Sequence, residues 1–329
     1  MHFGDPLQEL RAALAGDILC ELSRQGLIAA MGTDTETFLQ GQFTNDVRQV
    51  TLEHSQLSAY CNPKGRMLAS FRLFRHGDTY YLRLPREQVE FILKRLRMFV
   101  LRAKVTLEDA SDRLVQAGLA GPNATVLLQQ ALGVVPSQVD GVVQRNTIAV
   151  IRVPGVQPRF ELYGEVEALE ALWAQLRSQV TPAGAESWQL LDILAGIPTI
   201  YAETREAFVP QMTNLQFLNG ISFRKGCYTG QEVVARTQYL GNLKRAMYRA
   251  RVNNTTPPQV GDELFSPPAD ASQRVGKIVD ACRHPDGGYV VLAVVLSDCV
   301  AHGTVLLGDE HGAKLEFEQL PYLPENRGT

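Results

Sequence analysis

The cysteines of this 329-residue chain are few and scattered, and no two of them form a C-x-x-C pair. The five residues are Cys20, Cys61, Cys227, Cys282 and Cys299. An odd number of cysteines so far apart indicates neither a disulfide framework nor a set of zinc or cluster ligands. The sequence therefore predicts no resident metal, and chemistry at cysteine would rest on a single thiol.

The chain also lacks an apolar run long enough to span a membrane. Its N-terminus, MHFGDPLQEL, has neither the basic nor the apolar region of a signal peptide. We therefore expect a cytoplasmic protein with no membrane partner.

Charge of one sign is not in excess either. The formal net charge is -3 and the isoelectric point is near 6.1. A chain so close to neutral has no strong positive electrostatic field, so its overall charge does not indicate nucleic-acid binding. We expect no stable direct binding of nucleic acid, so that any contact with RNA would be local or indirect.

The residues that are present suit a soluble α+β protein of two or three domains, with 45% hydrophobic and 20% charged side chains. Strand patterns at 57–61, 67–74 and 79–84 precede an amphipathic helix over 86–102. A similar order of strand, helix, strand, strand and helix recurs over 114–179, which suggests two split β-α-β lobes. After residue 242 short strands separated by Pro and Gly turns predict a small β-barrel.

We therefore divide the chain into four parts. They are a first lobe over 1–110, a second, ferredoxin-like lobe over 111–184, a segment over 185–243 that completes the body, and a C-terminal barrel over 244–325.

The most informative stretch is the octamer KGCYTGQE at 225–232. Thr229 and Glu232 form the T-x-x-E pattern of a capping box, which predicts a helix from Gly230. The predicted apolar face of this helix consists of Val233, Val234, Thr237 and Leu240, and Gly241 would end it.

Cys227 directly precedes this predicted helix, where uncapped amides and the helix dipole favour a thiolate. Arg224 and Lys225 would add positive charge beside it. Cys227 is therefore a candidate reactive or ligand thiol. The alternative is a small apolar residue packed in a tight turn between two glycines.

The segment over 220–245, GISFRKGCYTGQEVVARTQYLGNLKR, resembles the signature of the YgfZ family of folate-binding proteins. That family is related to the glycine-cleavage T-protein and is linked to iron–sulfur cluster maintenance and tRNA modification. The likeness extends to 208–211 and 213–216, and more weakly to 38–46. It implies a T-protein-like body of two lobes that binds a folate, followed by a β-barrel, and iron–sulfur enzymes or assembly factors as partners.

Tetrahydrofolate needs a flat apolar slot, acceptors for its pterin donors and a cation for its glutamate tail. Trp188 is the candidate for stacking, although a large indole also serves as core filler. Lys225, Tyr228, Gln231 and Glu232 of the octamer are the other candidate ligand contacts.

The chain departs from the T-protein pattern at two places. The resemblance places the acidic pair of that enzyme, one member of which is catalytic, at Ala69 and Ser70. The carboxylate that grips the pterin corresponds to Leu194, and Asp192 lies at a different helical angle. The departures favour a folate-binding accessory protein in iron–sulfur cluster assembly or repair. The alternatives are a one-carbon transferase and a scaffold that binds a protein partner without a ligand.

Overall fold

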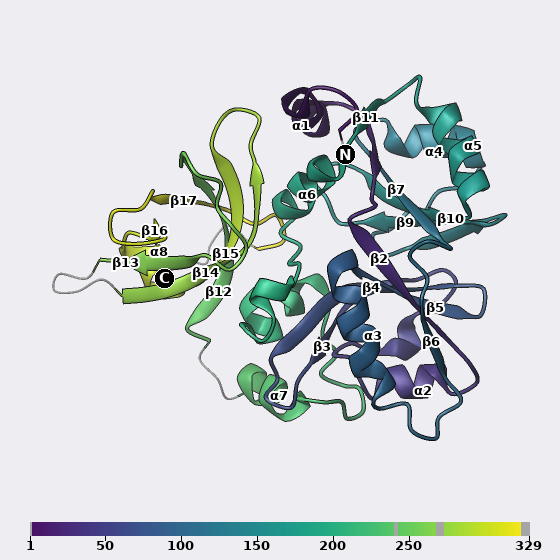
Figure 1. Ribbon diagram of the computed structural model, residues 1–329, viewed down its shortest axis with the longest axis horizontal. Helices are drawn as coiled ribbons and strands as arrows, with labels where there is room; N and C mark the ends of the chain where they lie inside the picture. Colours follow the sequence, from purple (N-terminus) through teal and green to yellow (C-terminus); the bar gives the residue numbers. More distant parts are fainter. Residues whose placement is uncertain (1, 240–242, 268–272, 324–329) are drawn as a thin grey trace.

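The structure is a computed structural model, and it describes residues 2–239, 243–267 and 273–323. Three β-sheets organise these residues (Figure 1). Two of them form the body with its helices, and the third forms the C-terminal part beside it. The α+β class predicted from the sequence is confirmed.

The first sheet is antiparallel and has the order β3-β4-β5-β2-β6. Its strands are β2 (Gln25–Met31), β3 (Gln56–Cys61), β4 (Met67–His76), β5 (Thr79–Pro85) and β6 (Thr106–Asp109). Helix α3 (Val89–Arg97) covers it with Val89, Ile92, Leu93 and Leu96, which are all buried. The hairpins β3–β4 and β4–β5 agree with the predicted strand ranges. The predicted helix over 86–102 is shorter, because its first turn is a 3₁₀ helix (Arg86–Gln88) and its last residues form turns.

The second sheet has the order β11-β1-β7-β10-β9-β8. Its strands are β1 (Ile18–Glu21), β7 (Val115–Ala120), β8 (Val142–Arg145), β9 (Ile148–Val153), β10 (Arg159–Gly164) and β11 (Thr181–Ala183). Helices α4 (Ala124–Leu132) and α5 (Val166–Leu176) pack on it through a core of leucines with Phe160. Since β1 pairs with β7 and β11, the start of the predicted first lobe contributes a strand to the second sheet.

The C-terminal sheet is antiparallel and curled, with the order β16-β13-β14-β15-β12-β17. Its strands are β12 (Arg245–Val252), β13 (Glu263–Ser266), β14 (Gln273–Arg283), β15 (Tyr289–Leu296), β16 (Leu306–Leu307) and β17 (Leu315–Glu318). A short helix α8 (Ser297–His302) follows β15. The Leu315 amide donates to the Val305 carbonyl at 2.9 Å, which joins the two edges of the sheet. The prediction of a small C-terminal barrel is confirmed in this curled form.

Helices α1 (Pro6–Ala15) and α6 (Ala185–Leu194) pack against each other beside the second sheet, and α6 also contacts β14 and β15. The remaining helices are α2 (Thr35–Gln40), α7 (Gln231–Tyr239) and short 3₁₀ turns at Val47–Gln49, Ala202–Thr204, Pro210–Thr213 and Leu215–Leu218. Helix α1 was not predicted from the sequence. No helix in the described ranges combines the length and apolarity that a membrane span needs.

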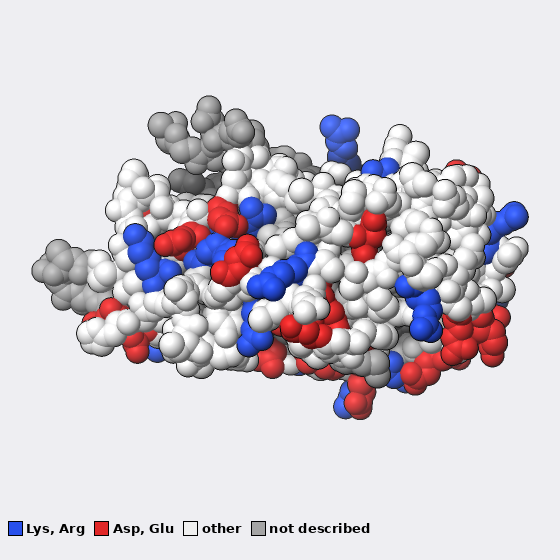
Figure 2. Space-filling model, turned by 90° about the horizontal axis from the view of Figure 1, so that it is seen from above, with Lys and Arg blue, Asp and Glu red and all other residues white. Residues whose placement is uncertain are grey.

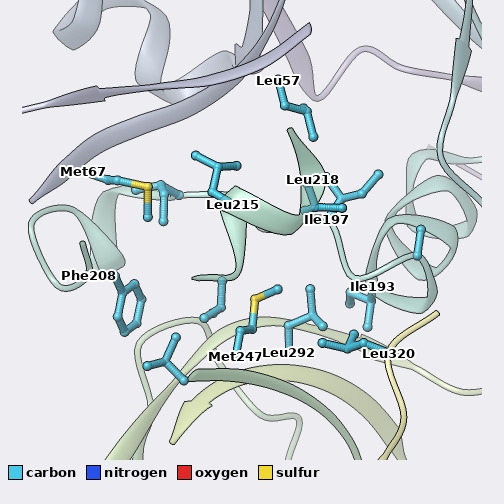
Figure 3. Packing of buried hydrophobic residues seen from close by; sticks show 14 of the residues in the cluster. Leu57, Met67, Ile193, Ile197, Phe208, Leu215, Leu218, Met247, Leu292 and Leu320 are labelled. Atoms are coloured by element: carbon cyan, nitrogen blue, oxygen red, sulfur yellow. The ribbon is translucent and has the colours of Figure 1, made fainter. Parts of the chain in front are cut away.

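A continuous apolar core joins the body to the C-terminal sheet (Figure 3). Met67 and Phe208 come from the body, Ile193 comes from α6, and Met247 and Leu292 come from the C-terminal sheet. All of these side chains are at least nine-tenths buried. Since buried apolar area is the main stabilising term of a fold, the two parts are held in a fixed arrangement. Residues from both parts can therefore line one site.

Candidate functional site

The octamer lies against the turn that joins β3 to β4. Helix α7 begins at Gln231, one residue after the predicted start. Gly230 has a φ of +84°, and a Cβ there would lie 2.4 Å from the Asn62 carbonyl oxygen, so only glycine fits. Val234 is fully buried, whereas Val233 is 37% exposed and packs over Gly65. The predicted apolar face of this helix is thus partly in the core and partly at the surface. Leu240, the last residue of that face, and Gly241, the predicted end of the helix, lie outside the described residues.

Lys225 fastens the octamer to the loop after α2. Its Nζ donates to the carbonyl oxygens of Gln40, Phe43 and Asn45 at 2.7, 2.6 and 2.8 Å. An ammonium group has three N–H donors, so this arrangement uses all of them. The side chain is 6% exposed. Lys225 is therefore a buried clamp between two segments that lie about 180 residues apart in the chain.

This placement corrects the roles expected for Lys225. A side chain with every donor used by carbonyl oxygens has none left for a folate tail. Burial lowers the pKa of its ammonium to about 8, which Asp46 opposes. The charge therefore lies in the protein interior, surrounded by carbonyl oxygens.

Cys227 is exposed, as its predicted chemistry requires. Cys20, Cys61 and Cys282 are buried, and burial raises the pKa of each of these thiols. Gly226 leaves open space on one side of Cys227, because a Cβ at residue 226 would meet no atom within 4 Å. Reagents in solution thus have access to this thiol, while the three buried thiols are held in their protonated form.

The other octamer candidates lie in different environments. Tyr228 is buried, with its ring centroid 5.1 Å from the Nζ of Lys225, and burial raises the pKa of its hydroxyl. Gln231 is half-buried and Glu232 is exposed in the first turn of α7. Tyr228 thus belongs to the support of the loop, whereas Glu232 is exposed in the first turn of the helix that follows the thiol.

Trp188 belongs to a different site. It lines a cavity of about 450 Å³ between the body and the C-terminal sheet. The described residues around this cavity come from 22–25, 85–87, 185–192 and 199–201, with Val260 and Asp280. The octamer contributes none of these residues, so the structure does not bring Trp188 together with the motif. Two candidate sites result, one for a small molecule and one built around Cys227.

The indole of Trp188 is held rigidly. It lies against Gly118 of β7, where a Cβ would come within 2.5 Å of the ring. The guanidinium of Arg159 lies 4.9 Å from the ring centroid on another side. Its indole nitrogen is buried and has no hydrogen-bond partner among the described residues. An unpaired buried N–H group costs free energy.

Asp280 supplies a carboxyl group to the same cavity from the C-terminal sheet. It accepts hydrogen bonds from Gln189 Nε2 at 2.6 Å, from the Ala281 amide at 2.8 Å and from the Tyr201 hydroxyl at 3.2 Å. Burial raises the pKa of this carboxyl to about 7. Asp280 thus changes its charge near neutral pH at the wall of the cavity.

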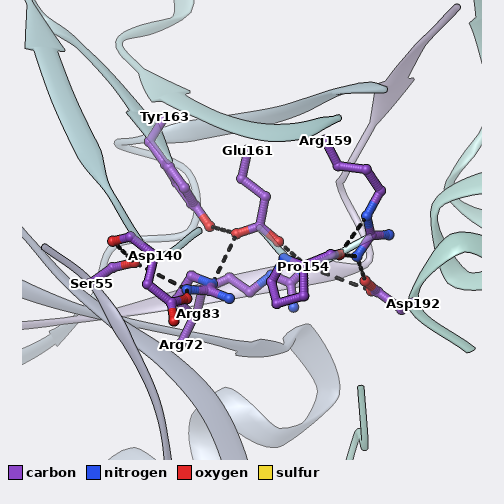
Figure 4. Close-up of polar contacts among 9 residues, drawn as sticks. All are labelled: Ser55, Arg72, Arg83, Asp140, Pro154, Arg159, Glu161, Tyr163 and Asp192. Atoms are coloured by element: carbon purple, nitrogen blue, oxygen red, sulfur yellow. Dashed lines mark hydrogen bonds and ion pairs between the residues drawn. The ribbon is translucent and has the colours of Figure 1, made fainter. Parts of the chain in front are cut away.

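Behind the cavity, buried charged residues join the two lobes (Figure 4). The closest ion pairs are Arg72–Asp140 at 2.5 Å, Arg83–Glu161 at 2.6 Å and Arg159–Asp192 at 2.8 Å. Burial by itself raises the pKa of the Glu161 carboxyl, but Arg83 and Arg72 lower it below its ordinary value. Since removal of one partner from a buried pair is strongly destabilising, we assign this network to positioning α6 and Trp188.

Comparisons with known proteins agree with this architecture. A family model described as the GCVT N-terminal domain matches residues 5–222. Proteins named tRNA-modifying protein YgfZ match nearly the whole chain. The protein from Colwellia psychrerythraea is 36% identical over 87% of this chain and 88% of its own. The protein from Photorhabdus laumondii is 33% identical over 92% of each chain.

The chain belongs to the YgfZ family. A solved structure of the glycine cleavage system aminomethyltransferase T from Bartonella henselae matches 96% of this chain and 89% of its own, with a TM-score of 0.78 and 19% identity. At this identity the likeness shows the fold alone. The resemblance stated from the octamer is therefore confirmed for the family and for the T-protein-like fold.

The resemblance assigns the T-protein carboxylates to three positions, Ala69, Ser70 and Leu194, and the structure shows what these side chains contact in this chain. Ala69 is fully buried. The Ser70 hydroxyl donates to the Pro198 carbonyl at 2.9 Å and accepts from the Ile200 amide at 3.1 Å. Leu194 packs against the core that joins the body to the C-terminal sheet. None of these three side chains offers a base to a ligand.

Sequence reasoning missed Asp280 and Arg159. Asp280 lies on β14 among apolar residues, and Arg159 opens the apolar strand β10. A charged residue inside an apolar strand signals a partner or a site. The sequence could not show that Asp280 and Trp188 line one cavity, because only tertiary packing brings their elements together.

Proposed function

We propose that this chain is a folate-binding accessory protein that acts in tRNA modification, by supporting the assembly or repair of iron–sulfur clusters in client enzymes. The observation that carries the folate part is the cavity beside Trp188. The observation that favours an accessory role over a transferase is the pair Ala69 and Ser70. The name of the family relatives, tRNA-modifying protein, supports the tRNA part.

The cavity has the chemistry that a reduced folate requires. Its volume, about 450 Å³, lies within the range of cavities that hold small molecules. Trp188 and Tyr201 give it aromatic walls, and Asp280 supplies a carboxyl group for a donor of the pterin. Arg24, an exposed residue at its rim, supplies a cation for the glutamate tail.

The positions that correspond to the acidic pair of the T-protein carry no acid or base. Ala69 has no functional group, and both hydrogen-bonding functions of the Ser70 hydroxyl are in use. General acid–base catalysis needs a titratable group within hydrogen-bonding reach of the reacting atom. We infer that folate is a bound ligand in this protein and not a substrate for aminomethyl transfer.

The thiol of Cys227 completes the proposal. Cys227 is exposed and lies between the buried side chain of Lys225 and helix α7. The thiol is therefore accessible, while the loop that carries it is anchored by Lys225. We assign it the working contact with iron–sulfur client enzymes or assembly factors. Gln231 and Glu232, in the first turn of α7, would then contact the partner.

A fluorescence titration tests the folate site directly. The chain has two tryptophans, so Trp173→Phe leaves Trp188 as the only indole. Tetrahydrofolate should quench this variant in a saturable manner. The matched control, Trp188→Phe, retains only Trp173, which packs against Phe3 away from the cavity, and should show no saturable quenching.

Calorimetry on Asp280→Asn measures folate binding without fluorescence, and so distinguishes binding in the cavity from nonspecific quenching. This change keeps the shape of the side chain but removes the negative charge and the remaining acceptor position that would bind a pterin donor, and we expect at least tenfold weaker binding. The absence of saturable binding at millimolar tetrahydrofolate would overturn the ligand assignment. Turnover of an aminomethyl donor by the purified protein would instead favour the transferase.

A further inference from the structure

A second pocket, of about 340 Å³, lies on the other side of the junction between the body and the C-terminal sheet. It is lined by Arg66, Phe208 and Met212 of the body and by Arg245, Arg274 and Lys277 of β12 and β14. No carboxylate is among the described residues that line it. The junction thus holds a cationic pocket with an apolar wall.

The charges of this pocket are only partly neutralised. Glu263 is shared by Arg274, at 2.8 Å, and Lys277, at 4.0 Å. Arg66 donates to the carbonyl oxygens of Glu206 and Ala207, so its contacts leave its full charge in place. Within the described ranges Arg245 has no side-chain partner and is half-buried. Four cations therefore face a single carboxylate.

The pocket is rigid because its walls belong to packed elements. Phe208 and Val294 are buried in the core between the body and the C-terminal sheet. Gly276 lies between the two cations of β14, and a Cβ there would come within 2.3 Å of the Val294 carbonyl oxygen. Glycine at this position therefore allows the close approach of β14 to β15. A fixed apolar wall loses little conformational entropy when a ligand packs against it.

The pocket also adjoins the support of the octamer. Arg66 follows Gly65, which packs on Val233 of α7. The Asn62 side chain accepts from the amides of Lys64 and Arg66, at 2.9 and 3.0 Å, and so fixes this turn. A ligand in the pocket therefore contacts the same turn that supports the helix after Cys227.

We propose that this pocket binds a backbone phosphate of RNA, with the attached nucleoside against the apolar wall. This proposal rests on the proposed role in tRNA modification and names a direct contact for it. The arginine side chains suit a phosphodiester, because guanidinium groups bind phosphate oxygens well. The apolar wall would contact the nucleoside, which a purely anionic ligand lacks. Lys and Arg lie scattered among Asp and Glu on the face of Figure 2, so attraction over that face is weak. Binding should accordingly be local and modest.

Fluorescence anisotropy with a labelled, unmodified tRNA transcript tests this proposal over a series of KCl concentrations. Arg245→Glu should weaken binding at least tenfold and reduce the slope of log K against log salt by about one. Lys277→Gln, a milder change, should weaken binding about threefold. The control is Lys94→Glu on the exposed face of α3, which makes the same kind of charge change outside the pocket and should leave binding unchanged. Thermal melting of each variant checks that it is folded.

Three results would overturn the proposal. The first is that the wild type does not bind the transcript at low salt. The second is that Arg245→Glu and Lys94→Glu weaken binding equally. The third is that Arg245→Glu loses binding of polyglutamylated folate but keeps its binding of tRNA. The last result would assign the pocket to the folate tail. Tetrahydrofolate binding at Trp188 is measured in a separate experiment. A negative result there therefore does not affect the interpretation of the tRNA measurement, and a negative tRNA result does not affect the folate assignment.

Discussion

The clamp formed by Lys225 gives the sharpest test of how the octamer is held. Lys225→Met keeps the length and most of the volume of the side chain but removes its three donors. The Phe43 carbonyl, which is fully buried, would then have no partner, while solvent can reach those of Gln40 and Asn45 in part. We therefore expect the loop after α2 to separate from the octamer.

The size of the effect follows from opposing contributions. Hydrogen bonds to a charged group each contribute about 1.5–3 kcal/mol, so the three together contribute roughly 4–9 kcal/mol. The reduction of the pKa from 10.5 to about 8 corresponds to an opposing cost of about 3 kcal/mol for the buried ammonium. Since two carbonyls regain water, we expect a loss of about 2–4 kcal/mol in the free energy of unfolding.

The dependence on pH has a definite sign. The folded-state pKa of Lys225 lies below its unfolded value, so between about pH 8 and 10.5 the unfolded chain binds more protons at this group than the folded chain does. The contribution of this group to stability therefore rises with pH in that window. The advantage of the wild type over Lys225→Met should grow by up to about 1.4 kcal/mol for each pH unit.

Urea denaturation at pH 7.5, 8.5 and 9.5 measures the difference, and hydrogen exchange locates it. The amides of 40–46 should lose protection in Lys225→Met. Lys64→Met is the matched control, because Lys64 is an exposed lysine in the neighbouring turn. If Lys225→Met unfolds like Lys64→Met and retains protection at 40–46, the clamp does not hold the octamer, and a role for Lys225 in ligand binding regains support.

Two further predictions concern Cys227 and Asp280. Cys227→Ser should unfold within about 0.5 kcal/mol of the wild type, because the site is exposed, yet fail to restore iron–sulfur enzyme activity in a deletion strain. In the wild type Cys227 should be alkylated faster than Cys20, Cys61, Cys282 or Cys299; full complementation by Cys227→Ser would show that the thiol is incidental. For Asp280 the folded-state pKa is raised to about 7, so the ionised carboxyl destabilises the fold and its contribution to stability falls from pH 4 to 7. Asp280→Asn should remove this fall in urea titrations, and an unchanged pH profile would show that another group causes it.

The sequence by itself determined the elements whose signals are local. The octamer identified the family, the hairpins β3–β4 and β4–β5 followed from strand patterns around turn residues, and short strands after residue 242 predicted the C-terminal sheet. The position of Cys227 before a predicted helix made it a candidate reactive thiol, and the structure leaves it exposed.

The tertiary structure alone decided which side chains share a site. The sequence predicts that Lys225 is a cation beside a thiol. In the structure its ammonium instead donates hydrogen bonds to carbonyl oxygens of a loop about 180 residues earlier. Asp280 and Trp188 line one cavity because α6 packs against β14. Strand β1 joins the second sheet by pairing with β7. These contacts depend on long-range packing of apolar surfaces, which has no local periodicity, so neither the cavity nor the cationic pocket has a signature in the sequence.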